Sequence, residues 1–442
     1  MNPVNDPTIT PSTTATPPTT ATPPTTATPP TTATPTPPVL ARTFRSLRHR
    51  DYRLYFVGQL VSLTGTWMQN AALAWLAYDL TGQSKWTAFV AVAQVVPTFA
   101  LGFVGGFLAD SFSRRGVLVA TQLAFLATAL ALAVLVGSGN VTPWQLLGLV
   151  VLHGVVQAVD LPTRLAFVNE LVEREDLPNA VALNAMLFNA ARAVGPAIAG
   201  GLLVLISPAA CFVANALSYA AVLVALGLMR GERFAASEPT PAGERGSLWS
   251  VFVYLAHHAT LGPLVLCAGG MALLGWPSLS LLPAVASVRL GAAEWVYSTL
   301  LSCVGLGAIS AALTVATVTT PRLRRPLLLT GYTLAAAGLI GLAWAVGVWQ
   351  ALASCYCLGF GLVMFFSTGQ TVVQMQVAQQ QRGRVLGIWA MTLSGAMPLG
   401  NLIVGPLADS FGTEPVLLAQ GLLCLGLAAV AARFVRALDQ GD

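Results

Sequence analysis

Charged residues are scarce in this sequence, and lysine is almost absent. Aspartate, glutamate, lysine and arginine make up only 9% of the 442 residues, whereas 55% are hydrophobic. A soluble domain carries about 25% charged residues. The scarcity of charge therefore excludes an ordinary soluble domain and predicts a chain that lies in lipid. Lys85 is the single lysine and no glycine-rich loop precedes it, which excludes a pump with a nucleotide-binding phosphate loop.

Cysteine and histidine are also few, and their spacing indicates no chemistry. All six cysteines lie inside apolar runs, without the loop spacing of a disulfide framework or a zinc site. The four histidines are scattered over separate segments, so the sequence offers neither a metal cluster nor a positioned catalytic base. We therefore expect no enzyme activity, no metal and no cofactor. The sequence also lacks the filter or charged ring that is typical of a channel.

Uncharged stretches of about 20 residues, each long enough to cross a bilayer as a helix, recur along the chain. They cover residues 54–78, 86–109, 117–137, 144–168, 180–205, 209–229, 261–285, 295–318, 327–347, 350–373, 385–407 and 415–435. We predict an all-α integral membrane protein with 12 transmembrane helices in two six-helix halves.

Basic residues are distributed unevenly between the two sides of this predicted bundle. Of the 22 basic residues, 19 fall in gaps on one side, Lys85 and Arg289 fall on the other, and Arg192 lies inside a stretch. The positive-inside rule then places both termini in the cytoplasm of a protein of the cell inner (plasma) membrane. The net charge of +5 is dispersed over short loops beside helix ends, where lipid headgroups explain it, so we expect no nucleic-acid partner.

Composition divides the chain into four parts. Residues 1–41 form a Thr/Pro-rich tail that we expect to be disordered and cytoplasmic. Residues 42–230 form the first six-helix half, 231–260 a cytoplasmic linker, and 261–442 the second half. The basic segment at the start of the first half, Arg42–Arg53, is spaced to lie on the membrane surface with its arginines at the headgroups.

Several motifs carry a family resemblance. Gly106-Phe-Leu-Ala-Asp110-Ser-Phe-Ser-Arg114-Arg115 resembles the signature loop of the major facilitator superfamily of transporters, from which it departs at two serines. The runs 162–166, 174–184 and 189–197 resemble the drug and siderophore exporters of that superfamily, which include enterobactin- and macrolide-type exporters. The resemblance covers about residues 44–436. It implies two halves that rock around a central cavity.

The resemblance also implies a cytoplasmic gate. Gly106 would allow close helix approach, and Asp110 would accept hydrogen bonds from a neighbouring helix N-terminus and pair with Arg114. Arg115 belongs to the same loop, and Arg384 marks the start of the span that the gate would meet. The alternative is that these residues only cap helices and fix topology. A similar run, Gly405-Pro-Leu-Ala-Asp409-Ser-Phe, closes span 11 on the opposite side.

One helical line in span 4 carries the candidates for proton coupling. His153, Gln157, Asp160 and Arg164 fall within about 40° of one line on a helix. An ionisable group inside the hydrocarbon is costly and is therefore a functional candidate: Asp160 as proton carrier, His153 as relay. The alternative is a simple Asp160–Arg164 pair near the cytoplasmic end, with His153 as a hydrogen-bonded core residue.

Arg192 in span 5 needs a partner. Asp160 is the nearest acidic candidate by topology, but Arg192 would also suit an anionic substrate or the cytoplasmic vestibule. Uncharged polar residues supply the candidates for a substrate cavity, with helix-to-helix hydrogen bonding as the alternative role. They are Gln59, Thr66, Asn70, Gln157, Asn184, Asn189, Gln370 and Gln374.

These features predict a monomeric secondary transporter whose partners are a small-molecule substrate, the lipid bilayer and protons. A cavity of amides and aromatics suits an amphipathic drug, siderophore or similar metabolite, exported by proton antiport. A lysophospholipid or lipid transporter is one alternative. A membrane sensor or scaffold that transports nothing is the other.

Overall fold

A computed structural model of the chain describes residues 44–230, 254, 255, 258, 260–291, 294–317, 323–377 and 381–434. The predicted tail and most of the predicted linker lie outside these residues. The side chains of Asp110, Asn189 and Arg384, all of which we singled out above, also lie outside the described part, although their helices are described. The division of the chain into four parts stays a prediction.

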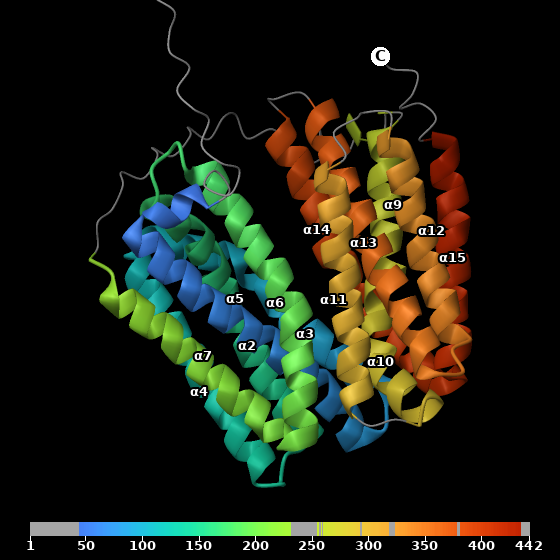
Figure 1. Ribbon diagram of the computed structural model, residues 1–442, viewed down its shortest axis with the longest axis horizontal. Helices are drawn as coiled ribbons and strands as arrows, with labels where there is room; N and C mark the ends of the chain where they lie inside the picture. Colours follow the sequence, from blue (N-terminus) through green and yellow to red (C-terminus); the bar gives the residue numbers. More distant parts are fainter. Residues whose placement is uncertain are drawn as a thin grey trace, which may run out of the picture. The chain divides into compact units, whose positions relative to one another are not determined.

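Within the described residues, all regular secondary structure is helical (Figure 1). The first half contains η1 (Arg45–Arg48), α2 (Arg50–Thr81), α3 (Ser84–Ser111), α4 (Arg114–Gly137), α5 (Pro143–Leu171), α6 (Leu177–Leu205) and α7 (Pro208–Leu228). The second half contains α9 (Leu261–Leu274), η2 (Trp276–Leu281), α10 (Leu282–Ala284), η3 (Val285–Arg289), α11 (Glu294–Thr317), α12 (Arg324–Ala343), α13 (Val348–Gln376), α14 (Arg382–Phe411) and α15 (Thr413–Phe434).

The described residues contain twelve helical spans. Eleven are long and apolar enough to cross a membrane, with the run from α9 to η3 counted as one span. The twelfth is α2, which has 32 residues and is less apolar because it carries Gln59, Gln69 and Asn70. The predicted all-α fold of two six-helix halves is confirmed.

The two halves repeat one packing scheme. In the first half α2 packs on α6 and α7, α4 packs on α5 and α7, and α3 packs on α5. The corresponding helices of the second half make the corresponding pairs: α9 with α14 and α15, α12 with α13 and α15, and α11 with α13. Between the halves α3 packs on α14 and α6 on α11. The two halves thus share one arrangement of helices, as in transporters built from repeats.

Glycines allow the closest of these pairs to form. A Cβ atom added to Gly105 of α3 would collide with the carbonyl oxygen of Ala158 in α5, and one added to Gly154 would lie 2.9 Å from the carbonyl oxygen of Ala93. Gly359 of α13 approaches the carbonyl of Val304 in the same way. Small residues at such contacts are typical of helix packing in lipid, where backbones must come close to gain van der Waals contact.

Span 7 differs from the single helix that its apolar run predicts. The α-helix ends at Leu274, and 3₁₀, α and π turns follow as far as Arg289. Pro277 and Pro283 lie at the starts of η2 and α10. Proline has no N–H to donate, so a regular α-helix cannot continue through it unchanged. The segment remains continuous but leaves Trp276 on an irregular turn.

The basic segment before α2 makes contacts that its spacing does not predict. Arg45 and Arg48 form ion pairs with the buried carboxylate of Asp176, at 2.6 and 3.0 Å; whether the segment also lies at the membrane surface stays a prediction. His49 Nε2 lies 2.7 Å from the same carboxylate, and Ser46 Oγ donates a hydrogen bond to the Asp176 carbonyl at 2.9 Å. The segment therefore fastens the start of α2 to the α5–α6 connection. Asp176 is more than 120 residues from these arginines in the sequence. Helical spacing describes only neighbouring residues, so it does not predict this ion pair.

Candidate functional site

A polar cavity of about 280 Å³ lies inside the first half. We call it the N-half cavity. It is lined by Gln59, Ser62, Leu63, Thr66, Trp67 and Asn70 of α2, Gln94, Val95 and Thr98 of α3, Gln122 and Phe125 of α4, His153, Gln157, Asp160 and Arg164 of α5, Phe188 of α6 and Tyr219 of α7. The structure thus brings the whole predicted line of span 4 to one space, together with Gln59, Thr66 and Asn70 from span 1.

Asp160 is the acidic group of this cavity. Its residue is only 2% exposed. Its Oδ1 accepts hydrogen bonds from Thr121 Oγ1 at 2.8 Å and from Gln122 Nε2 at 3.0 Å, both on α4. In the described part of the chain, no other hydrogen bond reaches Asp160 and no cationic group lies within ion-pair distance. Its second oxygen, Oδ2, is therefore the one left for a proton or a substrate donor.

Arg164 lies one helical turn from Asp160 but donates its hydrogen bond to a different residue. Its Nη1 donates to Gln59 Oε1 at 3.5 Å. The simple Asp160–Arg164 pair that we weighed is therefore not the arrangement of this structure. An arginine and an aspartate that share a cavity without pairing leave both charges accessible to a bound molecule.

His153 is buried, and its Nδ1 has no hydrogen-bond partner among the described residues. Its ring lies 4.5 Å from the ring of Phe125, which in turn stacks on Tyr219 at 5.2 Å. The hydroxyl of Tyr219 lies 3.3 Å from Thr66 Oγ1 and accepts from Asn215 Nδ2 at 3.2 Å. The wall of the cavity thus combines aromatic faces with amide and hydroxyl groups.

The remaining predicted residues do not line this cavity. Asn184 of α6 is half-buried, and Gln370 and Gln374 of α13 are exposed. No residue of the second half is among those that line the N-half cavity. Whether these three residues contact a substrate stays a prediction, and Asn189 lies outside the described side chains.

Arg192 makes no ion pair with Asp160, the acidic partner that topology suggested, among the described contacts. Its guanidinium carbon lies 5.4 Å from the centroid of the Trp276 ring, across the boundary between the halves. The sequence gives no hint of this contact, because Trp276 follows Arg192 by more than 80 positions and sits on the irregular turn after α9.

The arginines of the predicted gating loop contact the first half. Arg114 Nη1 pairs with Glu170 Oε1 at 2.8 Å, and Arg115 donates to the carbonyl oxygens of Leu226 and Gly227 at the end of α7. A Cβ atom added to Gly106 would meet no described atom within 4 Å, so no described residue makes the close helix approach that we expected at this glycine. Basic groups at helix carboxyl ends are favourable, since carbonyls there lack partners.

The similar run at the end of α14 makes a direct contact between the halves. Asp409 accepts hydrogen bonds from the backbone N–H groups of Ser84 at 2.6 Å and Lys85 at 3.1 Å, one on each carboxylate oxygen. These are the first two residues of α3. An anion at a helix N-terminus meets unsatisfied N–H groups and the positive end of the helix dipole. A Cβ atom added to Gly405, one turn earlier, would lie 2.6 Å from Ala88 Cβ.

The residues that our sequence reasoning missed are uncharged. Thr121 and Gln122 hold Asp160, and Gln94 and Thr98 line the cavity one turn apart on α3. Polar residues inside apolar runs are the signal that could have found them. That signal does not separate cavity lining from helix-to-helix hydrogen bonding, such as the buried Asn215–Gln69 bond at 2.9 Å.

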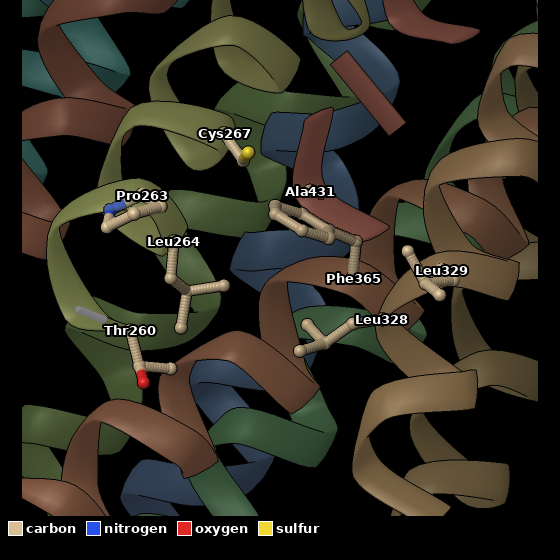
Figure 2. A pocket seen from close by; sticks show the side chains of 8 residues that line it. All are labelled: Thr260, Pro263, Leu264, Cys267, Leu328, Leu329, Phe365 and Ala431. Atoms are coloured by element: carbon tan, nitrogen blue, oxygen red, sulfur yellow. The ribbon is translucent and has the colours of Figure 1, made fainter. Parts of the chain in front are cut away.

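A second, apolar pocket lies within the second half (Figure 2). Its volume is only about 10 Å³, which is room for a single water molecule. The side chains in Figure 2 are apolar except for Thr260 and Cys267. This pocket is a packing gap and not a substrate site.

Comparison with known proteins decides the family. A family model described as a transmembrane secretion effector, of the MFS type, matches residues 41–442. The chain belongs to this family. It is therefore a multi-pass membrane transporter of the major facilitator superfamily and not an enzyme, as the signature loop and the exporter motifs predicted.

Two curated relatives are similar over most of their length. The staphyloferrin A transporter of Staphylococcus aureus is 24% identical over 369 residues, which cover 81% of this chain and 90% of the relative. The multidrug efflux pump Tap of Mycolicibacterium fortuitum is 26% identical over 402 residues, or 87% and 96% of the two chains. Among solved structures, a bacterial homolog to the human lysosomal transporter Spinster, inward-facing and occupied, matches with a TM-score of 0.68 at 13% identity, covering 89% of this chain and 97% of the other. That match shows the fold alone.

Proposed function

We propose that this protein exports a small amphipathic molecule in exchange for protons, by alternating access to the N-half cavity. The observation that carries the proposal is the buried carboxylate of Asp160, which lines a polar cavity without a cationic partner in the described residues. A charge inside the hydrocarbon zone is costly and persists where it has a task. The two curated relatives, named as a siderophore transporter and an efflux pump, support export of this substrate class.

Asp160 is the proposed proton carrier. Thr121 and Gln122 hold Oδ1 and leave Oδ2 toward the cavity. His153, two turns away on the same helix, is the proposed relay, since its Nδ1 has no partner in the described residues. Arg164, Tyr55 and Tyr219 are the other ionisable groups near Asp160. Substrate and proton then compete for one cavity, which is the simplest basis for antiport.

Alternating access is supported by the way the halves meet. Asp409 binds the start of α3, and Trp75 of α2 stacks on Tyr297 of α11 with ring centroids 5.7 Å apart. Both contacts lie on the side that the arginine pattern predicts to be outer. Asp110 occupies the position in the run that ends α3 that Asp409 occupies in the similar run that ends α14. We propose that Asp409 latches the outer side in this state, and that Asp110 latches the inner side, near Arg384, in the opposite state.

The cavity chemistry sets the proposed substrate class. Its volume of about 280 Å³ lies just below the range of about 300–1,000 Å³ for sites that hold drug-sized ligands. Aromatic rings and amides suit an amphipathic organic molecule. Asn184, Asn189, Gln370 and Gln374 are proposed to complete the site when the halves close around it. We further propose a monomer in the plasma membrane with both termini in the cytoplasm.

The proposal is tested by accumulation assays. A panel of amphipathic compounds and siderophores is given to cells with and without the protein, and the measurement is repeated with a protonophore. We expect at least one compound to accumulate less in cells with the protein, and the difference to vanish when the proton gradient collapses. Export that is insensitive to the protonophore would remove the antiport claim, and labelled lysophospholipid in the panel tests the lipid alternative.

A further inference from the structure

Arg192 is a cation in the middle of a membrane-spanning helix. It lies 15 residues after Leu177 and 13 residues before Leu205, the two ends of α6. With a rise of about 1.5 Å per residue, it is roughly 20 Å from either end of the helix. A guanidinium at this depth cannot reach the headgroups, because its side chain is much shorter than that distance.

The guanidinium has no anionic partner in the described part of the chain. Its contact there is the indole face of Trp276 at 5.4 Å, and its five N–H donors make no hydrogen bond with described residues. A cation over an aromatic face is attracted to it, but this attraction is weaker than the cost of an uncompensated charge in hydrocarbon. Asp160, the acid that topology suggested, is held by α4 instead.

Trp276 adds a second donor without an acceptor. Its indole Nε1 is buried and has no hydrogen-bond partner among the described residues. A buried donor without a partner costs free energy. The ring also lies 6.4 Å from Phe366 of α13, which contacts Trp389 of α14 at 6.2 Å. Arg192 and Trp276 therefore both have N–H donors without a described acceptor. They lie beside the aromatic rings of Phe366 and Trp389 in the second half.

This group lies next to the N-half cavity along α6. Phe188, one helical turn before Arg192 on α6, lines the cavity and packs edge to face on Trp67 at 5.5 Å. Residues four apart on a helix share a face, so Arg192 lies one turn beyond the cavity wall, on the face of α6 that Phe188 presents to the cavity. A molecule whose body lies against Trp67 and Phe188 can place one end at Arg192.

We infer that Arg192 and Trp276 bind the anionic group, carboxylate or phosphate, of the transported molecule. The inference rests on the proposed export function and names its substrate class: amphipathic anions. The anion supplies the counter-charge that Arg192 lacks, accepts from guanidinium N–H groups in the bidentate manner that arginine favours, and takes the indole N–H as a further donor. Because Trp276 belongs to the second half, a bound anion also links the two halves.

The test measures binding and transport separately. Binding of 1-naphthoate, 1-naphthyl phosphate and the neutral 1-naphthamide to the purified full-length protein is followed by calorimetry. In Arg192→Gln we expect affinity for the preferred anion to fall about 10- to 100-fold, the size expected for losing a hydrogen bond to a charged group, while affinity for the amide is unchanged. Arg192→Lys keeps the charge and retains most of the affinity. Arg53→Gln, an exposed arginine at the start of α2, is the matched control and binds as the wild type does.

A second variant distinguishes the loss of a donor to the anion from misfolding of the protein. Trp276→Phe keeps the aromatic ring and removes the N–H donor, so we expect a smaller loss that is again confined to the anions. Tighter binding of naphthoate than of the phosphate identifies an organic acid as the substrate, and the reverse identifies a phosphate such as that of a lysolipid. Equal affinity of the wild type for the anions and the amide, or equal anion affinity in Arg192→Gln and the wild type, would overturn the inference. Absence of flux in wild-type proteoliposomes would reject the export function alone, since the binding result stands apart from it.

Discussion

At the scale of single residues, the account depends on one carboxylate. Asp160 is held on one side by Thr121 and Gln122 and faces a polar cavity on the other. This geometry allows the group to exchange a proton with the cavity without losing its position, because both donors of α4 use the same oxygen.

We predict that Asp160→Asn abolishes coupled transport and keeps exchange. An amide preserves shape and still accepts from Thr121, but it neither takes up nor releases a proton at neutral pH. In proteoliposomes, uptake driven by a pH gradient should fall by about 100-fold or more, the size expected for loss of a group that takes part in proton transfer. Exchange of labelled for unlabelled substrate should continue. Asp160→Glu is the control that keeps the carboxyl group. Full gradient-driven transport by Asp160→Asn would remove this residue from the mechanism.

The residues of this site were only partly predictable. Helical spacing placed His153, Gln157, Asp160 and Arg164 on one line, because periodicity is a local property of the sequence. The partners of these groups are not local. Which donor reaches Asp160, and which ring lies over Arg192, depends on how helices distant in sequence pack together. For that reason Gln122 and Trp276 escaped sequence reasoning.

At the scale of elements, the segment Arg45–His49 is the clearest case of contacts that the sequence pattern does not predict. Its spacing suits a membrane surface, yet Asp176 holds it against the α5–α6 connection. The carboxylate of Asp176 is fully buried, whereas the side chains of Arg45 and Arg48 are 44% and 50% exposed. Part of this attraction is therefore screened by solvent, and the burial of Asp176 gives the remainder its strength.

We predict that Asp176→Ala releases this segment. Loss of the shared carboxylate removes one contact each from Arg45, Arg48 and His49 and destabilises the local structure by about 2 kcal/mol, between the values for exposed and buried pairs. Trypsin cleaves after arginine, so limited proteolysis at Arg45 and Arg48 should become faster. Glu175→Ala is the matched control, since Glu175 is 82% exposed, and should be cleaved like the wild type. Equal cleavage of Asp176→Ala and the wild type would show that the segment is held by other contacts.

The positions of the helices were predicted well from the sequence. The irregular turns in the second part of span 7 were not predicted. Long apolar runs are sufficient to place the spans, because lipid demands a helix wherever the backbone crosses it. The break after Leu274 coincides with Pro277 and Pro283. A proline frees backbone groups from their hydrogen bonds, and its effect on the helix depends on whether neighbouring helices provide new hydrogen-bond partners for those groups. The sequence alone does not show these partners.

At the scale of the whole transporter unit, the repeated packing scheme gives the mechanism its symmetry. The pairs α3–α14 and α6–α11 join two copies of one arrangement, and related motifs end α3 and α14. Each motif can serve as a latch on one side of the membrane. The pair of motifs can be recognised in the sequence. The contact of Asp409 with Ser84 and Lys85 cannot be predicted from it, because the partners are separated by more than 300 positions.

The most direct test of alternating access is the distance between the halves at this latch. Spin labels at Gln83→Cys and Thr413→Cys, in a chain whose native cysteines are replaced by serine, report that distance by pulsed electron paramagnetic resonance. We predict a short distance in the resting protein and a second, longer population when substrate or pH changes. Asp409→Asn should raise the longer population, because an amide offers one acceptor oxygen to the two N–H groups where the carboxylate offers two, and it has no charge to interact with the helix dipole. A single distance that is unaffected by substrate, pH and Asp409→Asn would contradict the account.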